Sequence, residues 1–404
     1  MCSIFGIKSK NTRLYKRSEL LSHRGPDGSG QYTDGENIFL CHNRLSIIGL
    51  DNNSAQPMQG HDGSQIVYNG EIYNFSDLKT EELSEYQFRS NSDTEVILAL
   101  YEKYGADCVQ YLRGMFAFAI WDEKRQRLFC ARDRFGIKPI YFNHSDEAFI
   151  FASEMKAILP FLNDITTNFE ALSEYFAFQY TLGDQTLFNN IFQLMPGHFL
   201  ILENDTLTVK KYWDVNYRID KEHSEKFFEE KLEYLMNDSV KYHQVSDVPV
   251  GGYLSGGIDS SLVVALATES NEDFYGSFHG RFTQYPGYDE SEFAKSASHA
   301  SKKDLFTIDI SARDFTENIF KVIYHLDSPV AGPGSFPQYM VSKLASEHVK
   351  VVLGGQGGDE LFGGYARYII AYFEQCIKAA IEGTHENGNF VVTPQSIIPN
   401  LTLL

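Results

Sequence analysis

The 404-residue sequence lacks several features that would point to particular classes of protein. It has no apolar stretch long enough to span a bilayer, and its first residues lack the charged start and long apolar core of a signal peptide. An excess of basic residues is also missing, since the formal net charge is −19. We therefore expect neither insertion into a membrane nor nonspecific binding to nucleic acid.

Cysteine is scarce and scattered. The five cysteines have no CxxC spacing and are odd in number: Cys2, Cys41, Cys108, Cys130 and Cys376. This pattern argues against structural zinc and against a disulfide framework, and it favours a reducing cytoplasm. Hydrophobic residues make up 43% and charged residues 22% of the chain, as in ordinary globular proteins. The length predicts two domains, which we place at residues 2–215 and 216–404.

The first of these domains is predicted to be rich in strands. Short runs of β-branched and aromatic residues, separated by turn clusters, lie at 37–42, 65–68, 115–121, 127–131, 140–143, 148–152 and 198–203. Helices are predicted at 92–104 and 168–180. Ser92 and Glu95 have the spacing of a capping box at the start of the first helix.

Beyond residue 215 the pattern changes to strands that alternate with helices. A helix is predicted at 224–243, with one apolar stripe formed by Phe228, Leu232, Leu235 and Met236. Buried strands at 249–254 and 349–353 each end in a glycine-rich loop, and a helix at 260–268 follows the first loop. Such alternation predicts a parallel sheet covered by helices on both faces.

Cys2 is a candidate nucleophile. If the initiator Met is removed, Cys2 carries the free α-amino group, which has a pKa of about 8 beside a thiol of about 8.5. The amine can then serve as the base of its own residue's thiol, without a histidine. Taken alone, a cysteine at the second position is more simply an accident of sequence.

The context of Cys2 is more informative. The start Met-Cys-Ser-Ile-Phe-Gly is followed in order by further blocks at 23–27, 44–47, 68–74, 92–95, 113–118 and 132–139. The set resembles the glutamine amidotransferases with an N-terminal nucleophile, and asparagine synthetases in particular. The resemblance covers the whole first half of the chain and implies an α+β fold there, an αββα sandwich of the Ntn type.

The resemblance implies roles that fit the chemistry of glutamine. Arg44 suits the substrate carboxylate, and Glu71 and Asp93 suit its ammonium. The side-chain amide of Asn69 and the backbone N–H of Gly70 would stabilise the oxyanion that forms when Cys2 attacks. The implied glutamine-binding set is Arg44, Leu45, Ser46, Ile47, Ile48, Asn69, Gly70, Glu71 and Asp93.

Other parts of the same blocks have simpler interpretations. Arg44 alone could form a surface salt bridge, and Asp93 alone could be a favourable charge at a helix N-terminus. We interpret 113–118 and 132–139 as structural segments, and His23 as a packing or hydrogen-bonding residue.

The second half carries the motif Ser255-Gly256-Gly257-Ile258-Asp259-Ser260 between a predicted strand and a predicted helix. Backbone N–H groups and a helix N-terminus at such a turn can bind an anion, with serine hydroxyls (Ser255, Ser260 and Ser261) as further donors. The spacing is not that of a Walker loop. It resembles the pyrophosphate loop of ATP pyrophosphatases, and a plain strand-to-helix turn is the alternative. The glycine-rich segment 354–365 resembles the second signature loop of asparagine synthetases.

These resemblances imply a Rossmann-like α/β domain that uses ATP and Mg²⁺. The implied ATP-binding residues are Leu254, Ser255, Gly256, Gly257, Asp259, Ser260, Gly280, Gly354 and Gly355, and Asp259 and Asp359 would hold the metal. Glutamine would be hydrolysed at Cys2 through a thioester, and ATP would adenylate an acceptor carboxylate, aspartate by resemblance. Ammonia would then displace AMP and form an amide. The resemblance leaves a homodimer open.

Two departures from the family pattern affect this interpretation. Asparagine synthetases carry Ser-Gly-Glu-Gly in the second loop, whereas this chain has Gly354 and Gln356 in place of the Ser and the Glu. The side chain of Gln356 cannot act as a base, unlike the glutamate that it replaces. The alternative hypothesis is therefore a different acceptor, such as a sugar carboxylate. Relatives also continue well past this loop, so we expect the synthetase domain to be incomplete here, and residues 393–404 do not resemble a natural domain end.

Three further alternatives can be compared with the sequence. Sugar-phosphate and phosphoribosyl amidotransferases share the Cys2 half but lack the loop at 255–260. β-Lactam synthetases keep the ATP half but lose the nucleophile, which the presence of Cys2 contradicts. A non-catalytic or glutaminase-only remnant would also fit Gln356 and the short second half. That reading predicts no trapping of Cys2 by an electrophilic glutamine analogue.

Overall fold

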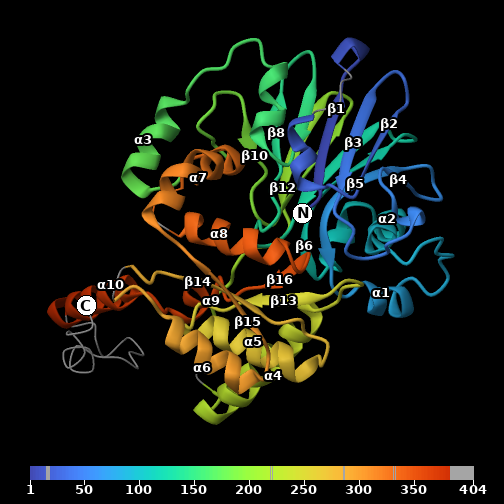
Figure 1. Cartoon of the computed structure of the whole chain (residues 1–404). Helices are drawn as coiled ribbons and strands as arrows, with labels where there is room; N and C mark the ends of the chain where they lie inside the picture. The colour runs from blue at the N-terminus through green and yellow to red at the C-terminus, as the bar shows by residue number, and fades with distance from the viewer. Residues whose placement is uncertain are drawn as a thin grey trace. The chain divides into compact units, whose positions relative to one another are not determined.

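The computed structural model describes residues 1–14, 19–218, 220, 222–284, 287–330, 332 and 334–382 (Figure 1). The chain forms two compact units. Unit 1 comprises Met1–Val250 and Asp309–Val351, and unit 2 comprises Gly251–Ile308 and Val352–Leu404. Residues 309–351 therefore pack with the N-terminal part of the chain, although they lie beyond the domain boundary that we place at residue 215.

Unit 1 contains two six-stranded antiparallel sheets. Sheet A has the order β10-β8-β9-β1-β3-β2 and consists of β1 (Ser3–Lys8), β2 (Gly28–Thr33), β3 (Ile38–Arg44), β8 (Tyr141–His144), β9 (Phe149–Ala152) and β10 (Phe192–Gln193). Sheet B has the order β12-β11-β7-β6-β5-β4 and consists of β4 (Met58–Gln59), β5 (Gln65–Ile72), β6 (Gly114–Asp122), β7 (Arg127–Arg132), β11 (His198–Glu203) and β12 (Thr206–Lys211).

The two sheets pack face to face through a buried apolar layer. Ile4 and Leu40 of sheet A share this layer with Val67 and Trp121 of sheet B. Because successive side chains of a strand point to opposite faces, every second residue of β1 and β5 points into the space between the sheets. The N-terminus of the chain enters the fold at one end of that space, since β1 contacts β5.

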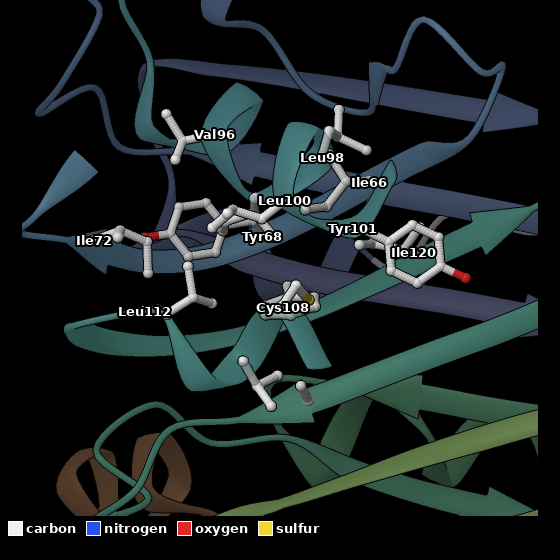
Figure 2. Close-up of a cluster of buried hydrophobic side chains, with 14 of the residues drawn as sticks. Ile66, Tyr68, Ile72, Val96, Leu98, Leu100, Tyr101, Cys108, Leu112 and Ile120 are labelled. Carbon is white, nitrogen blue, oxygen red and sulfur yellow. The ribbon is translucent and has the colours of Figure 1, made fainter. Parts of the chain in front are cut away.

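The outer faces of the sheets are covered differently. A second cluster joins sheet B to α2 (Asp93–Tyr104) and η4 (Gly105–Gln110), and Figure 2 shows the Val96, Leu98 and Leu100 side chains of α2 among those of β5. The outer face of sheet A is covered by the short 3-10 helices η2 (Glu19–Arg24), η5 (Met155–Ala157) and η6 (Leu159–Phe161). The predicted αββα sandwich is confirmed, with 3-10 turns in the layer against sheet A.

The remaining elements of unit 1 are four longer helices and three short ones. They are α1 (Phe75–Glu81), α3 (Phe169–Phe178), α4 (Glu225–His243), α7 (Ala312–Leu326), α8 (Ser335–Ser346), η1 (Thr12–Leu14) and η3 (Asn52–Ser54). Among the described helices, none is long and apolar enough to cross a bilayer.

Unit 2 is built on a four-stranded sheet of order β15-β14-β13-β16. Its strands are β13 (Val250–Tyr253), β14 (Ser277–Arg281), β15 (Leu305–Asp309) and β16 (Val351–Leu353), and its helices are α5 (Ile258–Ser270), α6 (Ser291–Ser301), α9 (Gly358–Phe362) and α10 (Ala366–Glu382). β13 and β14 pair in parallel, and α5 connects them. The predicted alternation of strands and helices is thereby confirmed.

Three local predictions are wrong in detail. Ser92 caps α2 by accepting from the N–H of Thr94, but the Glu95 carboxylate accepts from Ser90 in the preceding loop, so no capping box forms. The helix predicted at 168–180 ends at Phe178, because Gln179 adopts a left-handed conformation with φ 69°.

The third concerns α4, whose predicted apolar stripe is not part of a core. Phe228, Leu232 and Leu235 are exposed within the described chain, and Val240 is the residue of this helix that is buried. Residues 393–404, which do not resemble a domain end, lie outside the described residues.

Candidate active sites

Cys2 lies at the point where β1 enters the space between the two sheets. Ile4 belongs to the layer between the sheets, so the two-residue period of the strand places the Cys2 side chain on the same face. On β5, Val67 belongs to that layer, and the same period places Asn69 and Glu71 beside it. The fold therefore turns the candidate nucleophile and two of its expected partners toward one another.

The Cys2 thiol is held by the backbone of Leu45. The N–H of Leu45 donates to Sγ at 3.3 Å, and Sγ lies 3.6 Å from the carbonyl oxygen of the same residue. Burial raises the pKa of the Cys2 thiol, while the Leu45 N–H, the chain terminus and Lys138 act in the opposite direction. The neighbouring cations thus partly offset the cost of forming a thiolate in a buried site.

The chain terminus is also held in place. Arg24 donates through Nε to the Cys2 carbonyl oxygen at 3.0 Å, and its Nη2 lies 3.8 Å from the sulfur of Met1. Burial lowers the pKa of the Met1 α-amino group to about 6, and the charges of Arg24 and Lys138 add to that effect. In the chain that still carries Met1, this terminal amine is therefore largely neutral near pH 7.

Asn69 and Gly70 present donors that have no acceptor within the described chain. The Asn69 side chain is only 1% exposed, and its Nδ2 has no hydrogen-bond partner. The N–H groups of Tyr68 and Ile72 point away from β6, toward the side chains of Gln56 and Asp93. By the period of the strand, the N–H of Gly70 points the same way, and no described side chain accepts from it.

Gly70 is required by the sheet itself. A Cβ at this position would overlap the carbonyl oxygen of Met115 and lie 2.7 Å from the Cα of Phe116, both in β6. The neighbouring strand alone therefore excludes a side chain at this position.

Glu71 is a buried carboxylate that accepts no hydrogen bond within the described chain. Burial raises its pKa to about 7, although the Lys138 charge acts to lower it. Lys138 is also buried, which lowers its pKa, and its ammonium has no hydrogen-bond or ion-pair partner among the described residues. These two groups, with the Cys2 thiol and the terminal α-amine, form a cluster of titratable groups whose pKa values depend on one another.

Lys138 is a residue that the sequence interpretation missed. It lies in the segment 132–139, which we interpret as structural. That interpretation fits Asp133, whose carboxylate accepts from the N–H groups of Phe116, Ile137 and Lys138 and so ties the turn to β6. Nothing in the local pattern distinguishes the buried side chain of Lys138 from an exposed one.

Arg44 and Asp93 already have partners in the structure. Arg44 donates through Nη1 to the carbonyl oxygen of Asp51 at 3.0 Å and through Nη2 to that of Gly49. Asp93 accepts from the Tyr68 hydroxyl at 2.8 Å and from the N–H of Ile72 at 2.9 Å, and burial raises its pKa. Both groups are thereby held rigidly, at the end of β3 and at the start of α2.

The expected glutamine-binding segment 45–48 continues from Arg44. The N–H of Ser46 donates to Asp27 at 2.8 Å, the carbonyl oxygen of Ile47 accepts from the N–H of Asp247 at 3.0 Å, and Ile48 is buried. Asp247 also accepts from the N–H of Gly49 at 2.7 Å. The segment is therefore fixed on both sides of the residue that contacts the thiol.

In unit 2, the loop between β13 and α5 is closed by two serines. The Ser255 and Ser260 hydroxyls lie 2.9 Å apart, and each also bonds to the backbone of Gly257. The two hydroxyls that we expect from the sequence to serve as ligand donors thus support the loop itself. Gly256 has a φ of +100°, which glycine adopts without strain.

No side chain caps the N-terminus of α5, where Gly257 is the N-cap residue. The first N–H groups of this 13-residue helix therefore lack intrahelical acceptors and add to the positive end of the helix dipole. This is the arrangement in which a helix binds a phosphate group.

The second glycine-rich loop lies against the first. A Cβ at Gly355 would lie 2.8 Å from the Cβ of Asp259, and one at Gly358 would lie 2.6 Å from its carboxyl carbon. β13 and β16 are adjacent in the sheet, so both loops follow the ends of neighbouring strands. The Asp259 side chain thus lies against Gly355 and Gly358, where a larger residue would collide with it.

Around this loop, the structure places the remaining candidate ligands as follows. Leu254 is buried at the end of β13, Gly280 lies near the end of β14, and Asp359 lies in the first turn of α9. A Cβ at Gly354 would overlap Oε1 of Gln356, so the Gln356 amide occupies the space above this glycine. No group of three metal-ligating side chains occurs among the described residues, so a metal here would rely on Asp259, Asp359 and its ligand.

Comparisons with known proteins found matches for both halves of the chain. A family model described as a glutamine amidotransferase domain matches residues 1–213, and one described as asparagine synthase matches residues 231–396. The chain is 38% identical to glutamine-hydrolysing asparagine synthetase 1 of Bacillus subtilis over 380 residues, which are 91% of this chain and 59% of that protein.

Two further relatives extend the comparison. A putative glutamine-hydrolysing asparagine synthetase 2 of Methanocaldococcus jannaschii is 36% identical over 410 residues, 92% of this chain and 77% of that protein. The amidase chry2 of Gibberella zeae is 31% identical over 367 residues, 86% of this chain and 54% of that protein. The chain thus spans about three fifths of the length of the Bacillus protein.

Proposed function

The chain belongs to the family of glutamine-hydrolysing asparagine synthetases, and on that premise we propose that it hydrolyses glutamine at Cys2 and uses the ammonia, with ATP, to convert a carboxylate into an amide. Aspartate is the acceptor that we propose first. We assign glutamine hydrolysis to residues 2–215 and the ATP-dependent step to residues 216–404.

One observation carries the glutaminase proposal. The Asn69 amide nitrogen is buried without an acceptor, and its side chain faces the layer between the two sheets that Cys2 also faces. Leaving a buried donor unpaired costs roughly 1–3 kcal/mol, so folded proteins seldom contain one. An oxyanion formed at the thiol would supply the missing acceptor, and the N–H of Gly70 would be the second donor.

The proposed reaction begins with removal of Met1, which frees the amine of Cys2. This amine takes the thiol proton, and Sγ attacks the side-chain amide carbon of glutamine. Asn69 and Gly70 hold the oxyanion, and collapse of the intermediate breaks the C–N bond and leaves a thioester on Cys2. The protonated amine gives its proton to the departing nitrogen as the C–N bond breaks, so that ammonia is released, and water then hydrolyses the thioester.

We propose that glutamine is oriented by its ends. Arg44 would bind the carboxylate through guanidinium edges that its backbone partners leave open, and the backbone of 45–48 would line the same side. Glu71, which accepts no hydrogen bond from the described chain, would take the ammonium together with Asp93. A bound ammonium would lower the pKa of Glu71 and favour its charged form.

In unit 2, we propose that ATP binds with its phosphates at the N-terminus of α5, which no side chain caps. Ser255, Gly256 and Gly257 shape the loop, Ser260 closes it, and Leu254 and Gly280 flank the base. Gly354 and Gly355 form the opposite wall. The acceptor carboxylate attacks the α-phosphorus and releases pyrophosphate, and ammonia then displaces AMP.

Mg²⁺ fits the donor set of this site, because Asp259 and Asp359 are carboxylates without ion-pair partners among the described residues. It would neutralise charge on the phosphates when bound. We propose Mg²⁺ as the cofactor, and glutamine, ATP and the acceptor acid as the small-molecule partners. We also propose a cytoplasmic location, which the scattered cysteines suggest. A homodimer stays a prediction without a supporting contact.

The experiment that tests this proposal measures two products on the same protein. Ammonia release from glutamine should occur in the wild-type chain and disappear in Cys2→Ala, with Cys41→Ala as the matched control. AMP release should require ATP, Mg²⁺ and an acceptor acid, and should persist in Cys2→Ala when free ammonia is supplied. Loss of AMP release in Cys2→Ala despite free ammonia would contradict the assignment of separate sites.

A second candidate acceptor is supported by a specific observation. The Gln356 amide lies over Gly354, so the second loop has neither the serine nor the glutamate of the family pattern. A relative named as an amidase rather than as an asparagine synthetase is 31% identical to this chain. The alternative is therefore amidation of another carboxylate, such as that of a sugar acid. Aspartate-dependent AMP release at the rate of the best acceptor tested would exclude it.

A further inference from the structure

A buried ion network lies next to Cys2, and the reaction above does not use it. Glu154 is its centre: one carboxylate oxygen accepts from Arg24 at 2.8 Å and lies 3.0 Å from Nε2 of His23. The other oxygen accepts from Lys156 at 2.6 Å. The ammonium of Lys156 also lies 2.5 Å from Asp327 and 4.9 Å from the centre of the Tyr324 ring.

The network is balanced in charge and closed to solvent. Arg24 and Lys156 supply two positive charges, and Glu154 and Asp327 supply two negative ones, with all four side chains 5–8% exposed. Burial alone would raise the pKa of Glu154, but hydrogen bonds from His23 and Lys156 and the charge of Arg24 lower it to about 2. Glu154 is therefore a permanent anion between two cations.

Arg24 connects Glu154 to the backbone of Cys2. The guanidinium of Arg24 bonds to Glu154 with one edge and to the Cys2 carbonyl oxygen with Nε at 3.0 Å. Ser153, the neighbour of Glu154, accepts from the N–H of Ile4 through Oγ at 2.9 Å and donates its own N–H to the carbonyl oxygen of Ile4 at 3.0 Å. The residues that follow β9 thus hold Ile4 through two direct hydrogen bonds and Cys2 through Arg24.

This hold matters because Cys2 becomes the end of the chain once Met1 is removed. A terminal residue has no preceding peptide to restrain it, and a nucleophile must keep its orientation within about 10–20° to be effective. The Leu45 backbone restrains the thiol, but the Arg24 bond is the described side-chain contact that restrains the Cys2 carbonyl.

Asp327 brings a distant part of the sequence into the same network. It is the C-cap residue of α7, with a φ of 61°, and it accepts from the backbone N–H of Lys156 at 3.4 Å as well as from its ammonium. Along the sequence, α7 lies between the two glycine-rich loops of the ATP half, yet it packs within unit 1. His325 of the same helix lies 4.5 Å from the His23 ring.

We propose that Glu154 is a positioning residue for the Cys2 nucleophile, acting through Arg24, and that Asp327 completes its network from the segment between the two glycine-rich loops. The inference rests on the proposed glutaminase reaction. It adds that the turnover of glutamine depends on α7, a helix encoded within the ATP half of the sequence.

The test compares isosteric amides with a matched ion-pair variant elsewhere in unit 1. Glu154→Gln and Asp327→Asn keep the shapes of the side chains, and Asn tolerates the left-handed conformation at 327. The control is Glu203→Gln, which removes the partner of Arg127 at 3.0 Å, away from the contacts of Cys2. Glutamine kcat is expressed per Cys2 that reacts with an electrophilic glutamine analogue, so that unfolded protein is not counted.

The proposal predicts that Glu154→Gln lowers kcat by about tenfold or more and Asp327→Asn by about threefold, with KM changed less than about twofold. In the double variant, kcat should fall by about the same factor as in Glu154→Gln alone, because both residues act through one network. A kcat within about twofold of wild type in Glu154→Gln, or an equal loss in Glu203→Gln, would overturn it.

A second measurement separates this inference from the proposed function. The rate at which iodoacetamide alkylates Cys2, followed by peptide mass spectrometry, needs no glutamine turnover. If the wild-type chain releases no ammonia, the proposed function fails, but the alkylation rate still reports the position of the thiol. A change of about fivefold in Glu154→Gln, absent from Glu203→Gln, supports positioning, and equal rates in all variants contradict it.

Discussion

Replacing Asn69 by Leu should stabilise the fold and abolish most of the activity. The Asn69 amide nitrogen is buried without an acceptor, so Leu, which has nearly the same shape, removes a donor that costs roughly 1–3 kcal/mol to leave unpaired. The same change removes an oxyanion donor, which lowers kcat by about 10²–10³, or about 2.7–4 kcal/mol of transition-state stabilisation. Stability and activity should therefore move in opposite directions.

The assay pairs urea unfolding with ammonia release from glutamine, and Asn43 supplies the matched control for stability. Asn43 is also a buried asparagine, but its Nδ2 donates to the Ser3 hydroxyl at 2.9 Å. Asn43→Leu should therefore destabilise the protein by roughly 1–3 kcal/mol, because it removes a buried hydrogen bond to the Ser3 hydroxyl. The reasoning is refuted if Asn69→Leu is destabilised as much as Asn43→Leu, or if its kcat stays within about threefold of wild type.

Three further predictions follow from the same structure. Gly70→Ala should lower the urea midpoint by the equivalent of about 1–3 kcal/mol, because its Cβ would overlap Met115 of β6, and an unchanged midpoint would contradict that packing. Burial raises the pKa of Glu71 from 4.5 to about 7. Between these pH values the folded protein binds the Glu71 proton more tightly than the unfolded chain does, so the free energy of unfolding falls as the pH rises. The stability of Glu71→Gln relative to wild type should accordingly rise by about 2 kcal/mol between about pH 5 and about pH 8, and a flat difference would disprove the shift. Asp259→Asn or chelation of Mg²⁺ should abolish ATP-dependent AMP release and leave glutamine hydrolysis unchanged, whereas loss of both activities would contradict separate sites.

The sequence predicts the elements of the fold better than it predicts how their faces meet. The strand at 65–72 and the candidate residues Asn69 and Glu71 can be recognised from local pattern and family resemblance. Which face of that strand meets the N-terminus depends on the stacking of two sheets, and this is settled by Ile4 and Val67 packing together. Local periodicity therefore predicts the strand and its two faces, and tertiary packing decides which face meets the N-terminus.

The charged groups around Cys2 show the same limit more sharply. Arg24 and Glu154 lie 130 residues apart along the chain, and Lys156 and Asp327 lie 171 apart. A lysine or a glutamate in a polar segment is usually solvated, and only the fold reveals that these side chains are buried and paired. The two serines of the loop at 255–260 illustrate the reverse case, because hydroxyls that suit a ligand are used to close the loop.

The most direct test of the central claim is mass spectrometry of the purified chain after reaction with an electrophilic glutamine analogue. The account predicts that the initiator Met is absent and that a single adduct is attached to the sulfur of Cys2, now the first residue. Glutamine hydrolysis by a chain that still carries Met1, or an adduct on Cys41 in place of Cys2, would contradict it.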